Sequence, residues 1–376
     1  MPHSVYLDYN ATAPVKPQVI EVMAEVMADV GNPSSVHAQG RRARKRLSRA
    51  REQVAALVGA MPDAVIFTSG GTEANNQALI TAPGQLLTSA IEHPSVQVLT
   101  DDQDTLPVND DGVIDLDRLR DRVRSRSPDL LALMLANNET GVIQPVQQVA
   151  AIIDDTPGVK LHVDAIQAAG KIPIDMVDLA ADSLSLSAHK IGGPQGVGAL
   201  VLREGLEPRA LLRGGAQERR FRAGTENLPG IVGFGEAAAL ALEDADYHER
   251  VRKLRDRLER EMLGLSSDVR VVGAKAPRLP NTSCLILRGV SHETQLIHFD
   301  LAGIAVSAGS ACSSGKVGPS PVLTAMGHSL EDATSAIRVS LGWNSTDGDV
   351  DHFLNAAHNL LSRRKQRRHN NVASVR

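Results

Sequence analysis

The sequence predicts an α/β fold with two parts: a large domain built on a mostly parallel mixed sheet, and a smaller α+β domain. Apolar segments of strand length recur through the middle of the chain with helical or loop segments between them, which is typical of a parallel sheet. A second set of strands follows a long charged helical segment near residue 250. The length of 376 residues also favours two domains over one compact core.

The composition is that of a folded chain with an aliphatic, alanine-rich core. Apolar residues make up 42%, charged residues 22% and aromatic residues only 2%, so disorder is excluded as the main state. No apolar run approaches the roughly 18 residues of a membrane-spanning helix. The first residues lack the basic and apolar regions of a signal peptide. We therefore expect a cytoplasmic protein that does not contact a membrane.

The number of cysteines and the net charge disfavour a disulfide-stabilised protein, a metal-binding protein and a nucleic-acid-binding protein. Two cysteines, Cys284 and Cys312, are too few for a disulfide framework, and neither has the neighbours of a zinc site, so we expect no metal. The net charge of −4 gives no overall reason to bind nucleic acid. The arginine-rich segment 41–51 favours a solvated helix face over a nucleic-acid surface.

The first predicted elements are two helices and a strand–turn–helix unit. Apolar residues recur at helical spacing in 16–30 and 37–60, and the second run ends at Gly59. Residues 64–80, AVIFTSGGTEANNQALI, read as a buried strand, a glycine turn and a helix with Glu73 in its first turn.

The large domain is predicted to extend over residues 15–255. Its further strands are apolar segments that alternate with helices such as 144–155. These strands are expected at 130–136, 159–165, 183–188 and 196–202.

The small domain is predicted to combine residues 1–14 with 256–376. Its strands are expected at 269–273, 282–288 and 336–342. Cys284 lies in one of these strands and is interpreted as a small core residue. The tail, about residues 363–376, has too few apolar residues to pack and is expected to be flexible.

Two charged residues lie where predicted strands of the large domain end: Asp164 ends one strand, and Lys190 comes just after another. Groups just past the carboxyl ends of parallel strands face the ligand crevice, so Lys190 could be a Schiff-base lysine and Asp164 could pair with the ring nitrogen of a pyridoxal cofactor. A solvated loop lysine and a helix cap are the alternatives. The glycine turn at 68–72 presents backbone N–H groups and the positive end of a helix dipole, which suits a phosphate.

The other unusual feature is a cysteine in a segment rich in glycine and serine. Cys312 lies in SAGSACSSGKVGPS, about residues 307–320. A nucleophilic thiol that must move to its target and then carry the transferred group away requires mobility, which such a loop provides and a packed strand does not.

At this point the sequence resembles the cysteine desulfurases, which are pyridoxal 5′-phosphate (PLP) enzymes of aminotransferase class V. The resemblance extends from YLDYNATAPV at residue 6 to IRVSLG at 342, covering nearly the whole chain. The motifs occur in the family's order: TSGGTEANN, EHPSV, NNETG, HVDAIQ, SAHKIGGPQG, RAGTEN and SAGSACSSG. The resemblance implies a PLP-dependent transferase fold of type I, like that of aspartate aminotransferase. The segment around Cys312 is similar to that of the cysteine desulfurases with a long mobile cysteine loop.

The resemblance also implies roles for particular residues. Lys190 would form the Schiff base with PLP, Asp164 would pair with the pyridine nitrogen, Gln167 would bind the ring hydroxyl and His93 would stack on the ring. Asn138 would lie beside cofactor and substrate. Phosphate contacts would come from Gly71, Thr72, Ser187, His189 and Thr225 of a neighbouring subunit.

The implied reaction takes sulfur from L-cysteine. Arg338 would bind the substrate carboxylate, Lys190 would remove the Cα proton, and the Cys312 thiolate would attack the substrate sulfur, giving L-alanine and a persulfide on Cys312. The implied partners are a second copy of the chain in a homodimer and a sulfur-acceptor or scaffold protein of iron–sulfur assembly or thiolation.

Two other interpretations stay open at this stage. One is a class V PLP enzyme with another substrate, such as a selenocysteine lyase or an aminotransferase. The other is a non-catalytic binding protein with the same fold. The presence of Lys190, Asp164 and Cys312 together disfavours the non-catalytic binding protein. For single positions there are also structural alternatives: Asn138 could hold a turn, and Arg338 could be an interior ion-pair residue.

Overall fold

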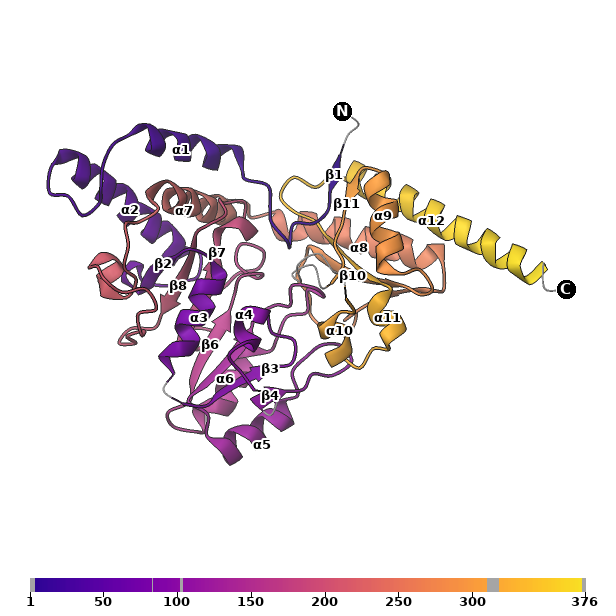
Figure 1. The fold of residues 1–376 in the computed structure, drawn as a ribbon, viewed down its shortest axis with the longest axis horizontal. Helices are drawn as coiled ribbons and strands as arrows, with labels where there is room; N and C mark the ends of the chain where they lie inside the picture. Colours follow the sequence, from indigo (N-terminus) through magenta and orange to yellow (C-terminus); the bar gives the residue numbers. More distant parts are fainter. Residues whose placement is uncertain (1–3, 83, 102–103, 310–317, 374–376) are drawn as a thin grey trace.

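The computed structural model describes residues 4–82, 84–101, 104–309 and 318–373. The described residues form three sheets, of seven, three and two strands. Figure 1 shows the part built on the seven-stranded sheet beside the part formed by the C-terminal third. This arrangement confirms the predicted α/β class with a smaller second domain.

The large sheet has seven strands in the order β2–β8–β7–β6–β5–β3–β4. Neighbours from β7 to β4 pair in parallel, whereas β8 runs antiparallel to both β7 and β2, so the sheet is mixed as predicted. The strands are β2 (Val65–Thr68), β3 (Leu86–Ser89), β4 (Thr105–Leu106), β5 (Leu130–Met134), β6 (Lys160–Asp164), β7 (Ser183–Ser187) and β8 (Gly198–Leu202).

Both faces of this sheet are covered, which is why its strands are apolar throughout. On one face, Phe67 and Leu131 pack with side chains from five helices in the largest core cluster. On the other, Ile66 packs against Ala74 and Ala78. The first set of helices is α1 (Pro17–Ala28), α2 (Ala38–Ala56), α5 (Leu116–Arg126), α6 (Val146–Asp154) and α7 (Leu228–Glu243), and the second face carries α3 (Gly71–Thr81).

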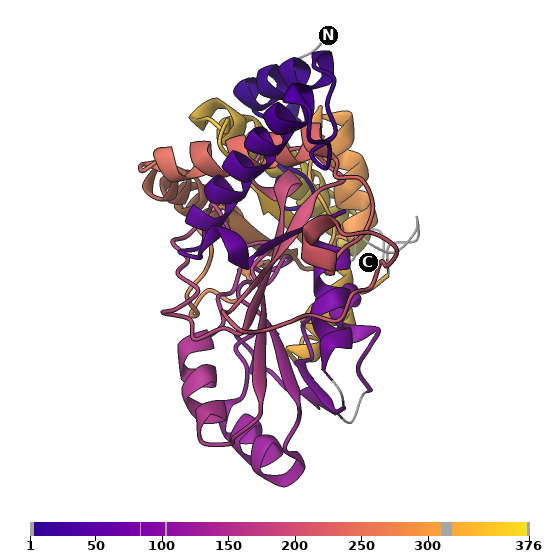
Figure 2. The ribbon, with the colours of Figure 1, turned by 90° about the vertical axis from the view of Figure 1, so that its left-hand side faces the viewer.

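Figure 2 turns the large domain toward the viewer. The indigo N-terminal helices lie at the top of this view and the magenta helix α5 at the bottom. A short helix, α4 (Pro94–Gln97), follows β3, and single 3-10 turns occur at Pro62–Ala64, Ala188–Lys190 and Gln217–Arg220.

The small domain is built on a three-stranded antiparallel sheet, and β1 pairs in parallel with β11 beside it. The N-terminal segment thus joins the C-terminal third of the chain. The elements are β1 (Val5–Tyr6), α8 (Tyr247–Leu265), β9 (Val269–Val271), β10 (Thr282–Leu287), α9 (His292–Leu301), β11 (Ile304–Ala305), α10 (Pro321–Ala325), α11 (Leu330–Thr334), β12 (Ala336–Ser340) and α12 (Asp347–Ala373).

Two boundaries differ in detail from the sequence-based expectation. The boundary predicted near residue 255 falls inside α8, and this helix packs from Val251 onward in the core of the small domain. The predicted flexible tail begins inside α12, which continues to Ala373 and extends away from the rest of the molecule (Figure 1). Arg364 on this helix forms an ion pair with Asp268, so the first residues of the tail have a partner that the composition alone does not reveal.

Candidate active site

A cavity of about 310 Å³ lies where the parallel strands of the large sheet end, and we call it the carboxyl-end cavity. Among the described residues, its lining includes every sequence-predicted site residue except Thr225. Those predicted residues are Gly71, Thr72, His93, Asn138, Asp164, Gln167, Ser187, His189, Lys190 and Arg338. Residues from both domains therefore meet around one space, as expected for a ligand crevice at the carboxyl ends of strands.

Asp164, the last residue of β6, is almost completely buried. Its Oδ1 accepts a hydrogen bond from the Ile166 N–H at 3.0 Å, and its Oδ2 accepts one from Asn75 Nδ2 at 2.8 Å. Burial raises the pKa of this carboxyl, while these hydrogen bonds and the nearby His93 and Lys190 act in the opposite direction. The carboxylate is thus oriented for a cationic partner.

His93 precedes α4 and is held by the turn that it caps. Its Nδ1 accepts a hydrogen bond from the Ser95 N–H at 3.1 Å and lies 2.8 Å from Ser95 Oγ. Burial lowers the pKa of His93, so the ring is neutral near pH 7. A neutral imidazole at the cavity wall is suited to stacking on an aromatic ligand.

Lys190 ends the 3-10 turn that follows β7. Its Nζ donates to the backbone oxygens of Asn10, at 2.5 Å, and Ala11, at 2.8 Å. These acceptors belong to the N-terminal segment that bridges the two domains. These two backbone carbonyl groups therefore help to hold the amine at the cavity.

One end of the cavity is suited to an anion. The N-terminus of α3 contributes Gly71 and Thr72, and a Cβ on Gly71 would lie 2.2 Å from the end of the Ile166 side chain, which would have to move to accommodate it. Burial and the charge of Lys190 lower the pKa of His189 to about 4, so His189 is neutral and can donate one N–H. Ser187 adds a hydroxyl to the same cavity.

Arg338, on β12, closes the cavity from the small domain. It is buried, and its Nη2 pairs with Asp8 Oδ1 at 2.7 Å while Nη1 donates to the Asn138 backbone oxygen at 3.0 Å. The Nε atom is buried and has no hydrogen-bond partner among the described residues. The Nε edge of this guanidinium is therefore left for a ligand carboxylate.

Two predicted residues remain: Thr225, which lies away from the cavity, and Cys312. Thr225 lines a surface groove with residues 30–39, away from the carboxyl-end cavity. Cys312 lies outside the described residues. At the ends of that stretch, Gly309 lines the cavity and Ser320 Oγ donates to the buried Glu139 Oε2 at 2.6 Å. Cys284 is buried in β10, and burial raises the pKa of its thiol, in line with a core residue.

Sequence reasoning did not single out several residues that hold the site together. Asn10 accepts hydrogen bonds from both Lys190 and Gln167, and Asn75 holds Asp164. Helical spacing gives a signal for Asn75, which lies one turn after Gly71 on α3. Asp8 and Asn10 carry no such signal, because their contacts form across more than a hundred residues of chain.

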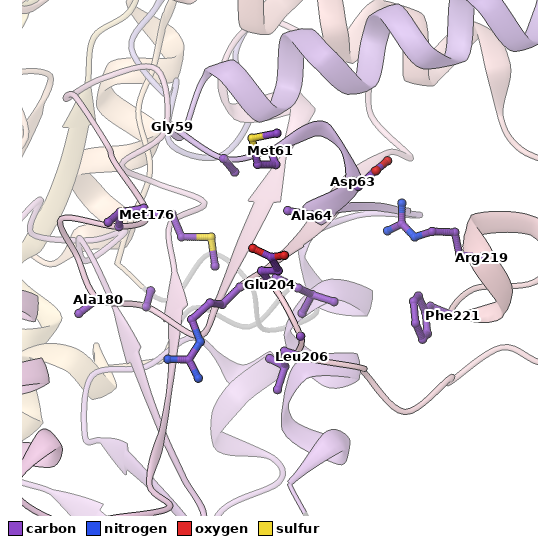
Figure 3. Close-up of a pocket in the computed structure, with 16 residues that line it drawn as sticks. Gly59, Met61, Asp63, Ala64, Met176, Ala180, Glu204, Leu206, Arg219 and Phe221 are labelled. Atoms are coloured by element: carbon purple, nitrogen blue, oxygen red, sulfur yellow. The ribbon is translucent and has the colours of Figure 1, made fainter.

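A larger cavity, about 670 Å³, lies at the opposite end of the large sheet, where the parallel strands begin, and we call it the amino-end cavity. Figure 3 shows Met61, Met176, Leu206 and Phe221 around it, with Arg219 at one side. No residue predicted for the active site lines it. The larger of the two cavities is therefore not the one around which the predicted site residues gather.

Two further properties concern only the described part of the chain. None of its helices is both long enough and apolar enough to cross a membrane. Within the same residues, no group of three or more His, Cys, Asp or Glu side chains could hold a metal ion.

Comparisons with known proteins agree with this geometry. Residues 5–353 match the family model for class-V aminotransferases. The cysteine desulfurase IscS of Dictyoglomus turgidum is 40% identical over 379 residues, covering 96% of each chain. A solved NifS-like protein from Rickettsia africae superposes with a TM-score of 0.89 at 34% identity, over 96% of this chain and all of that one. The structure titled SspA in complex with cysteine superposes with a TM-score of 0.78 at 29% identity, over 90% and 99% of the two chains. The chain belongs to the cysteine desulfurases of the class-V aminotransferase family.

Proposed function

We propose that this cysteine desulfurase binds PLP and L-cysteine in the carboxyl-end cavity and uses Lys190, His93 and Cys312 as its catalytic residues. The observation that supports this most strongly is the meeting of Lys190, the buried Asp164 and the half-paired Arg338 around one cavity. A buried acid, an amine and a guanidinium are costly to place together unless a ligand uses them.

The residues present fit PLP. Asp164 is a buried carboxylate oriented by two donors, Gln167 has one N–H without a partner among the described residues, and the N-terminus of α3 faces the same cavity. Asp164 would hold the ring nitrogen, Gln167 the ring hydroxyl, and His93 the ring face, with Asn138 beside it. Gly71, Thr72, Ser187 and His189 would hold the phosphate. When bound, PLP supplies a protonated pyridine ring that withdraws electrons from the substrate α-carbon.

The substrate would be held by its carboxylate and lose a proton to a lysine. The buried Nε edge of Arg338 offers a planar donor pair to the carboxylate of L-cysteine. Lys190 would attach the cofactor and, once displaced by the substrate amine, accept the Cα proton at Nζ. Its Nζ already lies at the cavity, where it donates to the backbone oxygens of Asn10 and Ala11.

Cys312 would carry the sulfur away. Its thiolate attacks the substrate sulfur, a sulfur–sulfur bond forms, and the substrate carbon–sulfur bond breaks. The electron pair of the broken bond stays with the carbon, which is protonated and leaves in L-alanine. Two thiols become one persulfide and one C–H bond, so the step needs no external oxidant.

The assembly and the destination of the sulfur are parts of the same proposal. Thr225 lies outside the cavity of its own chain, which supports a homodimer in which each chain gives Thr225 to the phosphate of the other. We further propose that the Cys312 persulfide passes to an acceptor or scaffold protein of iron–sulfur assembly or thiolation in the cytoplasm.

One experiment tests the core of the proposal. The purified protein, loaded with PLP, is incubated with L-cysteine, alanine is quantified, and intact and peptide masses are measured with Cys312→Ser as the control. We expect a sulfur adduct on Cys312 and alanine in the wild type, and no adduct in the variant. Alanine formation at the wild-type rate by Cys312→Ser would contradict the role of this thiol, and absence of both products in the wild type would point to another amino acid substrate.

A further inference from the structure

Lys171 is a buried lysine behind the carboxyl-end cavity whose hydrogen-bond partners carry no charge. Its Nζ donates to Asn10 Oδ1 at 2.9 Å and to Gln167 Oε1 at 2.8 Å, and the residue is only 4% exposed. Burial and the nearby Lys190 and Arg338 lower its pKa well below the usual range. Lysine is rarely buried without an acidic partner, so the position calls for a specific role.

The two partners differ in how much they depend on Lys171. Asn10 Oδ1 also accepts a hydrogen bond from Asn281 Nδ2 at 3.0 Å, so it stays satisfied without the lysine. Gln167 Oε1 has Lys171 as its donor. Removing the Lys171 amine therefore leaves a buried acceptor on Gln167 rather than on Asn10.

The orientation of the Gln167 carboxamide follows from these contacts. Its Nε2 donates to the Asn10 backbone oxygen at 3.0 Å, and this carbonyl can only accept. Lys171 donates to the opposite atom, Oε1. With both ends fixed, the second N–H of Gln167 has no partner among the described residues, and Gln167 lines the cavity.

We infer that Lys171 is a positioning residue, which holds the Gln167 oxygen away from the cavity so that the amide presents its free N–H to the ring oxygen of the bound cofactor. The inference rests on the proposed function, because it needs PLP in this cavity. Lys171 touches neither substrate nor cofactor in this scheme and acts through Gln167.

The test uses the PLP-loaded protein and follows the pH midpoint of its visible absorption. An N–H donor favours the deprotonated form of the chromophore, so its loss raises the midpoint. We expect Lys171→Met and Gln167→Leu each to raise it by about 0.5 to 1 pH unit, equivalent to a three- to tenfold change in a proton equilibrium. Asp164, His93, His189, Lys190 and Arg338 also face the cavity and are the same in all variants.

A double variant separates positioning from direct electrostatics. If Lys171 acts through Gln167, then Lys171→Met on the Gln167→Leu background produces no further shift. A second shift of equal size would mean that the lysine acts on the chromophore directly and would overturn the inference. Lys160→Met is the matched control, because Lys160 begins β6 at the other end of the strand, and it should leave the midpoint unchanged.

Gln167→Glu covers the case in which Lys171→Met fails to fold. The introduced carboxylate keeps a partner for Lys171 but offers no N–H, so the midpoint should rise at least as far as in Gln167→Leu. A midpoint equal to that of the wild type would overturn the inference. A wild-type protein that shows no visible band with PLP and no alanine formation would instead count against the proposed function, so the two failures are distinguishable.

Discussion

The two cavities at opposite ends of the large sheet differ in volume and in the charged residues that line them. The amino-end cavity is about twice as large, and Met61, Met176 and Phe221 line it together with the charged residues Asp63, Arg203, Glu204 and Arg219. The carboxyl-end cavity is smaller, at about 310 Å³, and gathers Asp164, Lys190 and Arg338. The larger cavity is thus not the one lined by the residues predicted from the sequence.

The difference follows from how the sheet is built. Where the parallel strands end, the chain must turn into helices or loops, so the last strand residues and the first helix N–H groups face one crevice. The small domain then covers that crevice with Arg338 from β12. Four predictions test this contrast between the two ends, from the largest expected effect to the smallest.

Lys190→Ala should have the largest effect. Because it removes both the attachment point and the proposed base, we expect loss of the visible absorption band and at least about a 1,000-fold fall in alanine formation. The matched control is Lys160→Ala at the start of β6, which should be as active as the wild type. Alanine formation by Lys190→Ala within tenfold of the wild type would remove Lys190 from the mechanism.

Changes at the Arg338–Asp8 pair should weaken substrate binding. Arg338→Lys loses the planar donor pair, and we expect the KM for L-cysteine to rise about 100-fold, with a smaller change in kcat. Asp8→Asn leaves the guanidinium less firmly held, and we expect a rise of about tenfold. Steady-state kinetics measure both, and an unchanged KM in Arg338→Lys would refute the carboxylate role.

A buried acid beside the carboxyl-end cavity should make stability depend on pH. Glu92 accepts hydrogen bonds from Ser89 and from the Met134 N–H, and burial raises its pKa from 4.5 to about 8. Because the folded pKa is the higher one, its contribution to stability is fully present below pH 4.5 and is lost as the pH rises through 8.

Glu92→Gln cannot ionise and should avoid this loss. The free energy of unfolding of Glu92→Gln relative to the wild type should therefore increase between pH 5 and pH 9, as measured by urea denaturation. A difference that is the same at both pH values would mean that Glu92 is ionised in the folded protein.

The smallest effect is expected at the amino-end cavity. Met61 is 75% exposed on its rim, and Met61→Gln should leave kcat/KM for alanine formation within about twofold of the wild type, as is usual for a surface substitution. A tenfold loss would show that the two ends of the sheet are functionally coupled and would contradict a functional difference between the two cavities.

Much of the fold and of the site could be predicted because its signals are local. A strand that ends on a charged residue, as at Asp164, or that is followed by a turn and Lys190, is visible in a few consecutive residues. The family motifs lie in the same order along the chain, and the comparisons confirm the family to which they point. The roles of the individual site residues stay predictions until the variants are made.

Less could be predicted where a residue forms a hydrogen bond or ion pair with another that is distant in the sequence. Glu73, which was expected only to favour a helix start, also accepts from the Ser69 N–H and pairs with Arg222. The helical course of residues 363–373 was missed because composition reports apolar packing and is silent about an ion pair such as Arg364–Asp268.

The sequence by itself determined the α/β class, the family, and the residue types that end each strand, because hydrophobic periodicity and short motifs are properties of neighbouring residues. Only the tertiary structure decided which of those ends meet. It brought the N-terminal Asp8 to Arg338 and Asn10 to Lys190 and Lys171, and it buried Lys171 behind Gln167. Such contacts depend on the packing of two domains against one N-terminal segment, which no local pattern encodes.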